Sequence, residues 1–218
     1  MELLARQHKE ETHMEILIVG SGNMARGIGL RLVRGGHQVR IADRQPDKAA
    51  DLAAELGESA AGEVLDSAAG AEVIVLATPY EGSLEVARLW ADQLAGKTVV
   101  DICNPVDFDT FDGLVTPPDK SAAQQIADAA PGARVVKAFN TTFASRLANS
   151  TPLDVFIAGD DPDAKKTVTG LCLDADLRPI DVGGLKHARA LEAFQLLHMK
   201  VQDQINGGWT TAIAFTEA

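Results

Sequence analysis

The chain has 218 residues, of which 46% are hydrophobic and 23% charged; this composition suits one large globular domain with an appendage and excludes a disordered chain. Its 31 acidic and 20 basic residues give a formal net charge of −11, which argues against nucleic acid and anionic membranes as partners. No apolar run approaches the ~20 residues that a membrane helix needs.

The cysteine and histidine content indicates the compartment and the metal content. Cys103 and Cys172 are too few for a disulfide framework or a zinc cluster, and the five histidines lack the spacing of metal ligands. Residues 1–15 lack the apolar core of a secretory signal. We therefore predict a cytoplasmic protein with two buried thiols and no bound metal.

From residue 15 onward, short β-branched segments alternate with segments of helical apolar spacing. The expected strands cover residues 15–20, 38–42, 73–77, 98–102, 134–138, 155–158 and 179–182. The expected helices cover residues 23–34, 46–56, 81–94, 122–129, 162–173 and 185–205. This alternation predicts an α/β fold, a doubly wound parallel sheet of the Rossmann type.

The domain organisation follows from two breaks in this pattern. Residues 107–120 have the composition of a long surface loop, and a weak seam falls at residues 149–152. We predict a dinucleotide-binding domain over residues 14–150 and a small C-terminal α/β cap over residues 151–218. The apolar tail residues Trp209, Ile213 and Phe215 are costly to expose, which indicates docking on the cap or on a partner subunit.

A glycine-rich turn, Gly-Ser-Gly-Asn-Met-Ala, directly follows the first strand and opens the first helix. Gly20 permits the tight turn, Gly22 lets the backbone approach a diphosphate, and Ala25 keeps the helix close to the sheet. Asp43 ends the second strand, 21 positions after Gly22, where an acidic residue typically binds the ribose of a dinucleotide. The combination predicts a bound NAD or NADP.

The choice between the two dinucleotides stays open at this point. The Asp43 carboxylate repels a 2′-phosphate and favours NAD. Arg44, Lys48 and the Ser21 hydroxyl could bind that phosphate and favour NADP, although Lys48 is equally well explained as a solvated charge at a helix start.

Polar and proline-containing segments follow three further strands. Because the carboxyl ends of parallel strands share one edge of a sheet, we expect these segments to join the same site. The predicted cofactor-binding residues are Gly20, Ser21, Gly22, Asn23, Met24, Asp43, Arg44, Lys48, Thr78, Pro79, Tyr80, Asn104, Pro105 and Ala138.

Six motifs in order along the chain resemble those of the NADP oxidoreductases that depend on coenzyme F420, and of their bacterial dinucleotide-binding relatives. They lie at residues 18–25, 75–80, 96–105, 135–141, 158–162 and 179–192. The resemblance implies hydride transfer between the nicotinamide C4 and the C5 of a deazaflavin, in a cleft between the nucleotide domain and the cap, and it implies a homodimer. It places the contacts to the 2′-phosphate of NADP on Ser21, Arg44 and Lys48, with Asp43 where the family usually has serine.

Asn140 bears on the identity of the acceptor. Members that use coenzyme F420 often carry histidine at this position, whereas the asparagine resembles the cytosolic reductase domain of six-transmembrane metalloreductases, which pass electrons from NADPH to a flavin. We therefore predict a small-molecule acceptor of flavin type: coenzyme F420, FMN or FAD. We predict a catalytic role for Asn140, whose amide would donate to the nicotinamide region or to the acceptor; the alternative is an asparagine that caps the next turn.

Two other functions remain open. The first is a redox sensor that binds the dinucleotide without turnover, which fold resemblance does not exclude. The second is an imine reductase similar to pyrroline-5-carboxylate reductase, which the glycine-rich turn also resembles. That enzyme class would require an all-helical C-terminal domain, whereas residues 155–158 and 179–182 have strand character.

Overall fold

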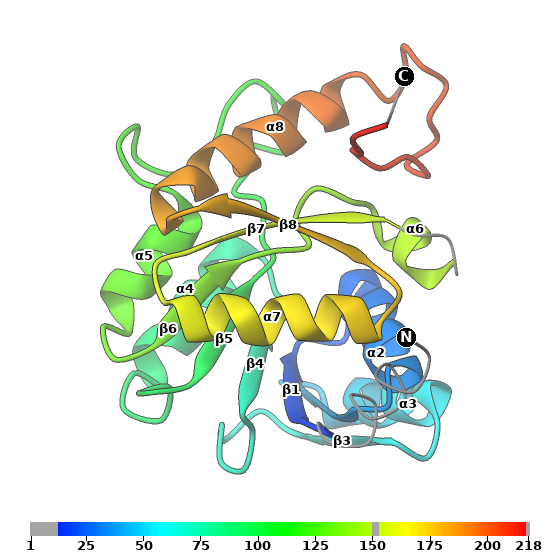
Figure 1. The fold of residues 1–218 in the computed structure, drawn as a ribbon, viewed down its shortest axis with the longest axis vertical. Coiled ribbons are helices and arrows are strands. Elements are labelled where there is room, and N and C mark those ends of the chain that lie inside the picture. The colour runs from blue at the N-terminus through cyan, green and yellow to red at the C-terminus, as the bar shows by residue number, and fades with distance from the viewer. Residues whose placement is uncertain (1–12, 150–152, 217–218) are drawn as a thin grey trace, which may run out of the picture.

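A computed structural model describes residues 13–149 and 153–216, which form one eight-stranded sheet with helices on both faces (Figure 1). The strands are β1 (Glu15–Val19), β2 (Gln38–Asp43), β3 (Ala60–Val64), β4 (Val73–Leu76), β5 (Thr98–Asp101), β6 (Arg134–Lys137), β7 (Asp154–Gly159) and β8 (Arg178–Gly183). Their order across the sheet is β3-β2-β1-β4-β5-β6-β7-β8. Every neighbouring pair is parallel except β6 and β7. The predicted α/β class with a doubly wound, mainly parallel sheet is thus confirmed.

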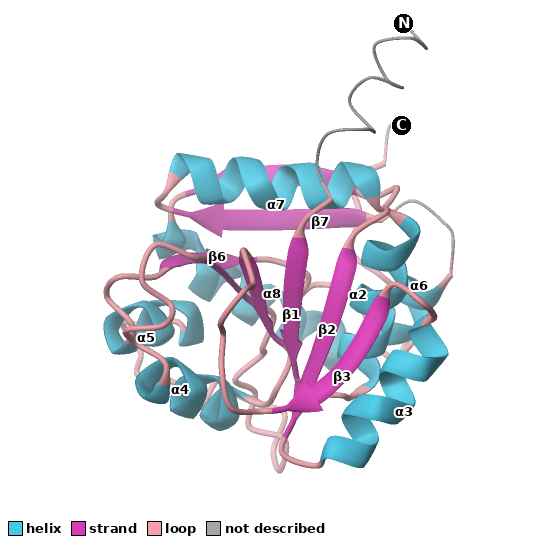
Figure 2. Ribbon diagram, turned by 90° about the horizontal axis from the view of Figure 1, so that it is seen from below, coloured by secondary structure: helices cyan, strands magenta, loops and turns pink. Residues whose placement is uncertain are grey.

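The helices cover the two faces of this sheet. They are α2 (Asn23–Arg34), α3 (Pro46–Leu56), α4 (Tyr80–Leu89), α5 (Ala122–Ala129), α6 (Ala144–Ala148), α7 (Pro162–Asp174) and α8 (Ala188–Lys200), with a 3₁₀ turn, η1 (Leu185–His187), before the last helix. Figure 2 shows α2 and α3 on one side of strands β1 to β3, and α4 and α5 on the other side.

The helices on both faces of the sheet explain why the central strands are apolar. In β1, Ile16 and Ile18 pack into the core on the side of α2 and α3, while Leu17 and Val19 pack into the core on the side of α4. All four side chains are fully buried. A strand that is covered on both faces must be apolar at every position, which is why the central strands could be recognised from the sequence.

The structure differs from the sequence-based expectation in several elements. The strand β3 and the five-residue helix α6 were not predicted. The helix expected over residues 81–94 ends at Leu89, and the one expected over residues 185–205 begins as η1 and ends at Lys200. Both ends are followed by turns.

The C-terminal strands continue the same sheet. β7 pairs with β6 through Val136↔Gly159 and Lys137↔Ala158, and β8 extends β7 in parallel. The expected boundary at residue 150 falls at residues 150–152, outside the described residues, so the division into a domain and a cap stays a prediction. The tail contacts this C-terminal part through the rings of Phe215 and Phe156, whose centres lie 5.5 Å apart, and it contacts the segment after β6 through a bridge between Ala212 and Thr142.

Candidate functional site

The glycine-rich turn between β1 and α2 has two glycines with different environments. Gly20 has a φ of +109°, and a Cβ placed on it would lie 2.6 Å from the carbonyl oxygen of Ala77, at the end of β4. A Cβ on Gly22 would meet nothing within 4 Å. Gly20 is therefore required by the turn itself, whereas Gly22 opens onto space beside the N-terminus of α2, as a diphosphate-binding turn requires.

Two cavities flank this turn along the carboxyl ends of the strands. The first cavity, about 520 Å³, extends from Gly22 across the ends of β4 and β5 to α8. The second cavity, about 480 Å³, extends from Gly20 to the end of β2. Both are lined by Thr78, Pro79 and Glu81, so they adjoin at the start of α4. Their sizes lie within the range of small-molecule sites. Because the two cavities adjoin, they suit an elongated ligand that places one part in each.

The second cavity carries the charged groups at the end of β2. Asp43 accepts a hydrogen bond from the Ser21 hydroxyl at 2.7 Å through Oδ2, and one from the Gln45 backbone N–H at 2.9 Å through Oδ1. Arg44 donates to Glu85 at 2.7 Å, and both of these side chains are exposed. Asp43 is thus held by the glycine-rich turn and by its own loop, while Arg44 is engaged in a solvated ion pair.

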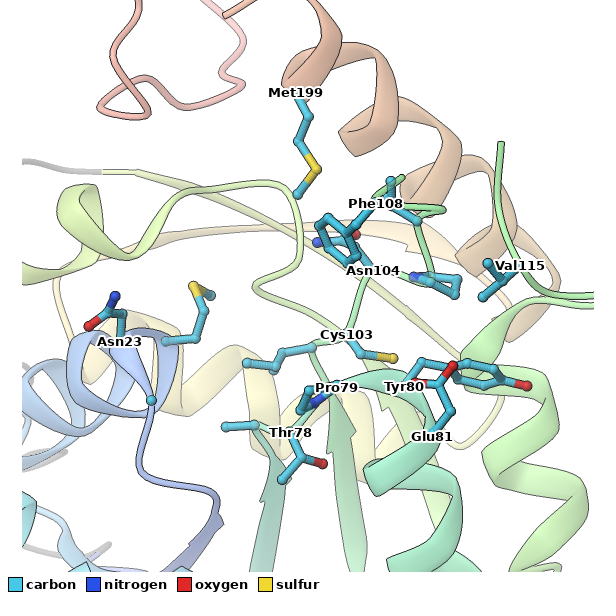
Figure 3. A pocket seen from close by; sticks show the side chains of 16 residues that line it. Asn23, Thr78, Pro79, Tyr80, Glu81, Cys103, Asn104, Phe108, Val115 and Met199 are labelled. Atoms are coloured by element: carbon cyan, nitrogen blue, oxygen red, sulfur yellow. The ribbon is translucent and has the colours of Figure 1, made fainter. Parts of the chain in front are cut away.

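The first cavity is mainly apolar (Figure 3). Asn23 of α2 lies on one side of it, and Tyr80 and Glu81 of α4 lie on the other. Burial raises the pKa of the Cys103 thiol well above its ordinary value, and the Asp101 carboxylate adds to this rise. Burial and the neighbouring Cys103 raise the pKa of the Tyr80 phenol. Both groups are therefore protonated at neutral pH, and the cavity suits an uncharged ring.

Asn140 lies behind the first cavity rather than in its lining. Its side chain is 1% exposed, and its amide donates to Asn104 Oδ1 at 3.0 Å and to the Leu191 carbonyl of α8 at 3.1 Å. Asn104, which lines the cavity, donates in return to the backbone carbonyl of Asn140 at 3.0 Å. Both N–H groups of Asn140 are thus engaged within the protein, while its buried Oδ1 has no partner among the described residues.

A buried group of charges also lies behind the first cavity. Lys137 of β6 is fully buried and donates to Asp101 of β5 at 2.8 Å, to Glu192 of α8 at 3.0 Å and to the backbone carbonyl of Cys103 at 2.5 Å. Burial alone would lower the pKa of Lys137, but Asp101, Cys103 and Glu192 outweigh it and raise the pKa. Burial raises the pKa of Glu192, against the pull of Lys137. We call Lys137, Asp101 and Glu192 the buried charge cluster.

The structure brings most of the predicted cofactor residues together. The first cavity is lined by Gly22, Asn23, Met24, Thr78, Pro79, Tyr80, Asn104 and Pro105, and the second by Gly20, Asp43, Arg44, Thr78 and Pro79. Neither cavity is lined by Ser21, Lys48, Ala138 or Asn140. Lys48 is exposed near the start of α3, and Ala138 is buried at the end of β6.

Several residues of the first cavity were not predicted, namely Ala77, Glu81, Ile102, Cys103, Val106, Phe108, Val115 and Met199. Phe108 and Val115 belong to the segment expected only as a loop, and Met199 comes from α8, far along the chain. The buried charge cluster was missed as well. One signal could have found it: Asp101 and Lys137 are charged residues of opposite sign at the ends of two adjacent apolar strands, where they face each other in register.

Comparison with known proteins assigns the chain to a family. An F420-dependent NADP reductase of Methanocaldococcus jannaschii is 30% identical over 198 residues, which cover 83% of this chain and 88% of the relative. A family model described as NADP oxidoreductase, coenzyme F420-dependent, matches residues 15–105. The chain belongs to this family. It is accordingly an NADP-dependent oxidoreductase of the F420 reductase type.

Two further proteins are similar to this chain, one in sequence and one in structure. Metalloreductase STEAP3 of Rattus norvegicus is 36% identical over 197 residues, which cover 88% of this chain but only 38% of that longer protein. A crystal structure from Arthrobacter sp. FB24, of a protein proposed to be an F420-dependent NADP reductase, matches with a TM-score of 0.76 and 29% identity. That match covers 94% of this chain and 99% of the other.

Two observations concern other kinds of site. Within residues 13–149 and 153–216, no helix combines the length and the apolarity needed to cross a bilayer. In the same part of the chain, no three His, Cys, Asp or Glu side chains are grouped in a way that could hold a metal ion.

Proposed function

We propose that this oxidoreductase transfers a hydride between NADP(H) and a planar acceptor of flavin type, such as coenzyme F420, FMN or FAD. The observation that carries the proposal is the pair of adjoining cavities on either side of the glycine-rich turn, one with charged side chains and one mainly apolar. Hydride transfer between two rings depends chiefly on holding the donor and acceptor carbons about 3–3.5 Å apart. A mainly apolar cleft serves this purpose.

The dinucleotide fits the residues that are present. α2 begins directly after Gly22, no side chain of the described residues caps its first turn, and the space beside Gly22 is open, so the backbone N–H groups of this turn would hold the diphosphate. The adenosine end would occupy the second cavity at Asp43 and Arg44, and the nicotinamide end would enter the first cavity past Met24. Bound NADPH would supply the hydride.

The preference for NADP over NAD is assigned to Arg44. Asp43 accepts hydrogen bonds from Ser21 and Gln45, and Arg44 is the one Lys or Arg among the described residues that line the second cavity. Its ion pair with Glu85 is exposed, and such pairs contribute about 0–1 kcal/mol, so a 2′-phosphate could displace Glu85 at small cost. We expect Arg44→Ala to raise the Kd for NADPH about tenfold and to leave the Kd for NADH unchanged.

The test of the function is an oxidation assay. Purified protein is mixed with NADPH or NADH and with coenzyme F420, FMN, FAD or a ferric chelate, and nicotinamide absorbance is followed. Gly22→Val is the matched binding control, because a Cβ at this position meets no protein atom within 4 Å, so the added side chain extends into the open space beside the turn. Oxidation by a flavin-type acceptor that Gly22→Val abolishes supports the proposal. Tight NADPH binding without oxidation by any acceptor would favour the redox sensor instead.

The imine-reductase alternative is disfavoured by the C-terminal part of the fold. Residues 153–216 contain β7 and β8 alongside α7 and α8, and the all-helical domain of that enzyme class is not present there. The homodimer expected from the resemblance remains part of the proposal, and sedimentation of the purified protein measures it.

A further inference from the structure

An exposed phenylalanine stands at the mouth of the first cavity. Phe108 lines this cavity, yet 62% of its surface is exposed. In Figure 3 its ring lies between Met199 of α8 and the Cys103–Asn104 segment. A large apolar side chain at the opening of a ligand cavity is typical of a group that a bound ligand covers.

The Phe108 ring is supported by a chain of aromatic contacts. It meets Phe111 edge to face, with ring centres 5.6 Å apart. Phe111 contacts Trp209 at 6.5 Å, and Trp209 contacts Phe143 at 5.1 Å. Phe143 is buried and stacks on His198 of α8 at 4.7 Å. We call Phe108, Phe111, Trp209 and Phe143 the aromatic chain; it runs from the core to the cavity mouth.

Two members of this chain are held in an unfavourable backbone conformation. Phe111 has a φ of 50° and Trp209 has a φ of 59°, a region that bulky residues rarely adopt. Local contacts maintain both: the Phe111 N–H donates to the Asp107 carbonyl at 2.8 Å, and the Ser145 hydroxyl donates to the Trp209 carbonyl at 2.8 Å. Conformational strain of this kind persists where the surrounding structure enforces it, and it concentrates at ligand sites.

We propose that Phe108 is the specificity-determining residue for the acceptor: its ring packs against the planar ring of the acceptor, and the aromatic chain holds it in place. This proposal rests on the proposed function. Stacking on an aromatic face is tolerant of ring substituents and discriminates against compact, non-planar oxidants. The site therefore takes extended fused-ring acceptors, and Phe108 contributes to their binding without contributing to the binding of NADPH.

The experiment compares binding of two fluorescent acceptors, FMN and coenzyme F420, to wild type and Phe108→Ala. We expect Phe108→Ala to raise the Kd of the acceptor that the protein uses by about tenfold, with the Kd for NADPH unchanged. Phe108→Tyr keeps an aromatic ring, so its Kd for the acceptor should be close to that of wild type. Phe194→Ala is the matched control, since Phe194 is 44% exposed on α8 but does not line the cavity.

A second variant tests the support of the ring. Phe111→Asn removes the edge contact to Phe108, and asparagine tolerates a positive φ. We therefore expect the Kd for the acceptor to rise, but by less than in Phe108→Ala. Steady-state oxidation of NADPH serves as the kinetic readout: the KM for the acceptor should rise in Phe108→Ala in proportion to the rise of its Kd, and it should stay at the wild-type value in Phe194→Ala.

The two proposals fail in different ways. An acceptor Kd that stays within twofold of wild type in Phe108→Ala, or an equal rise of the Kd values for NADPH and for the acceptor, would overturn the role of Phe108 while leaving hydride transfer intact. An absence of NADPH oxidation by every acceptor in wild type would overturn the proposed function itself.

Discussion

Replacing Lys137 with methionine is expected to destabilise the fold severely. Methionine fills a similar volume but removes the cation that lies 2.8 Å from Asp101 and 3.0 Å from Glu192. Both carboxylates are fully buried, so water cannot replace the lost partner. Breaking a buried ion pair by removing one member costs about 3–5 kcal/mol, because an uncompensated charge remains in the interior.

Two features set the size of this loss. Asp101 keeps its bond from the Cys103 backbone N–H at 3.0 Å, and Glu192 keeps its bond from the Ala122 backbone N–H at 3.0 Å, so some compensation survives. Without Lys137, however, the two carboxylates repel each other, and the pKa of Glu192, already raised by burial, rises further. We therefore expect Lys137→Met to lower the free energy of unfolding by about 3–5 kcal/mol near neutral pH.

The same reasoning gives the sign of the pH dependence. A carboxyl group whose pKa in the folded state exceeds its unfolded value contributes stability that is present at low pH and is lost as the pH rises. The deficit of Lys137→Met should thus be larger at about pH 8 than at about pH 5.5.

Urea unfolding followed by tryptophan fluorescence measures this deficit by linear extrapolation. Lys165→Met is the matched control, because Lys165 pairs with an exposed partner, Asp181, at 2.9 Å, and such pairs contribute less than about 1 kcal/mol. A loss in Lys137→Met no larger than in this control, or a deficit that shrinks as the pH rises, would refute the reasoning.

Three further predictions concern the fold. Gly20→Ala should destabilise by about 2 kcal/mol more than Gly57→Ala, since both glycines have a positive φ but only Gly20 has backbone where the Cβ would lie; thermal or urea unfolding compares them. Arg31→Met should cost about 3 kcal/mol, because the buried guanidinium donates to carbonyls at the ends of α6 and α7; equal stability of variant and wild type would exclude this role. Burial lowers the pKa of His37, against the opposing Asp174 carboxylate. Its stabilising effect should therefore be present above about pH 6.5 and be lost as the pH falls below it, and His37→Gln should flatten that part of the measured stability curve.

The central strands could be predicted because burial on both faces makes them continuously apolar. β3 lacks this signal: its sequence, Ala-Ala-Gly-Glu-Val, is small and polar, and its side chains are exposed or half-buried. It exists because β2 offers a free edge and because Gly62 allows close approach to Ala50, where a Cβ would lie 2.6 Å from backbone. The antiparallel direction of β7 likewise depends on the path of the connection after β6, which no local pattern encodes.

The residues of the candidate site likewise fall into those that the sequence predicts and those that it does not. Residues that act through their own backbone position, such as Gly20 and Gly22, carry a spacing that can be read along the chain. Phe108, Met199 and Lys137 act through contacts with segments that are distant in sequence, so their significance depends on the tertiary structure. The catalytic role of Asn140 stays a prediction: its place at a strand end suggests a site residue, and its amide bonds to Asn104, which lines the cavity, and to α8.

The contacts behind the first cavity explain how α8 comes to line it. Leu191 and Glu192 are adjacent on α8 and accept buried hydrogen bonds from Asn140 and Lys137 respectively. Two such bonds from neighbouring helical positions fix the rotation of the helix about its axis as well as its distance from the sheet. Met199 lies about two turns further along the same helix and lines the cavity. The buried polar contacts therefore set the width of the proposed acceptor cleft, although their side chains lie outside its lining.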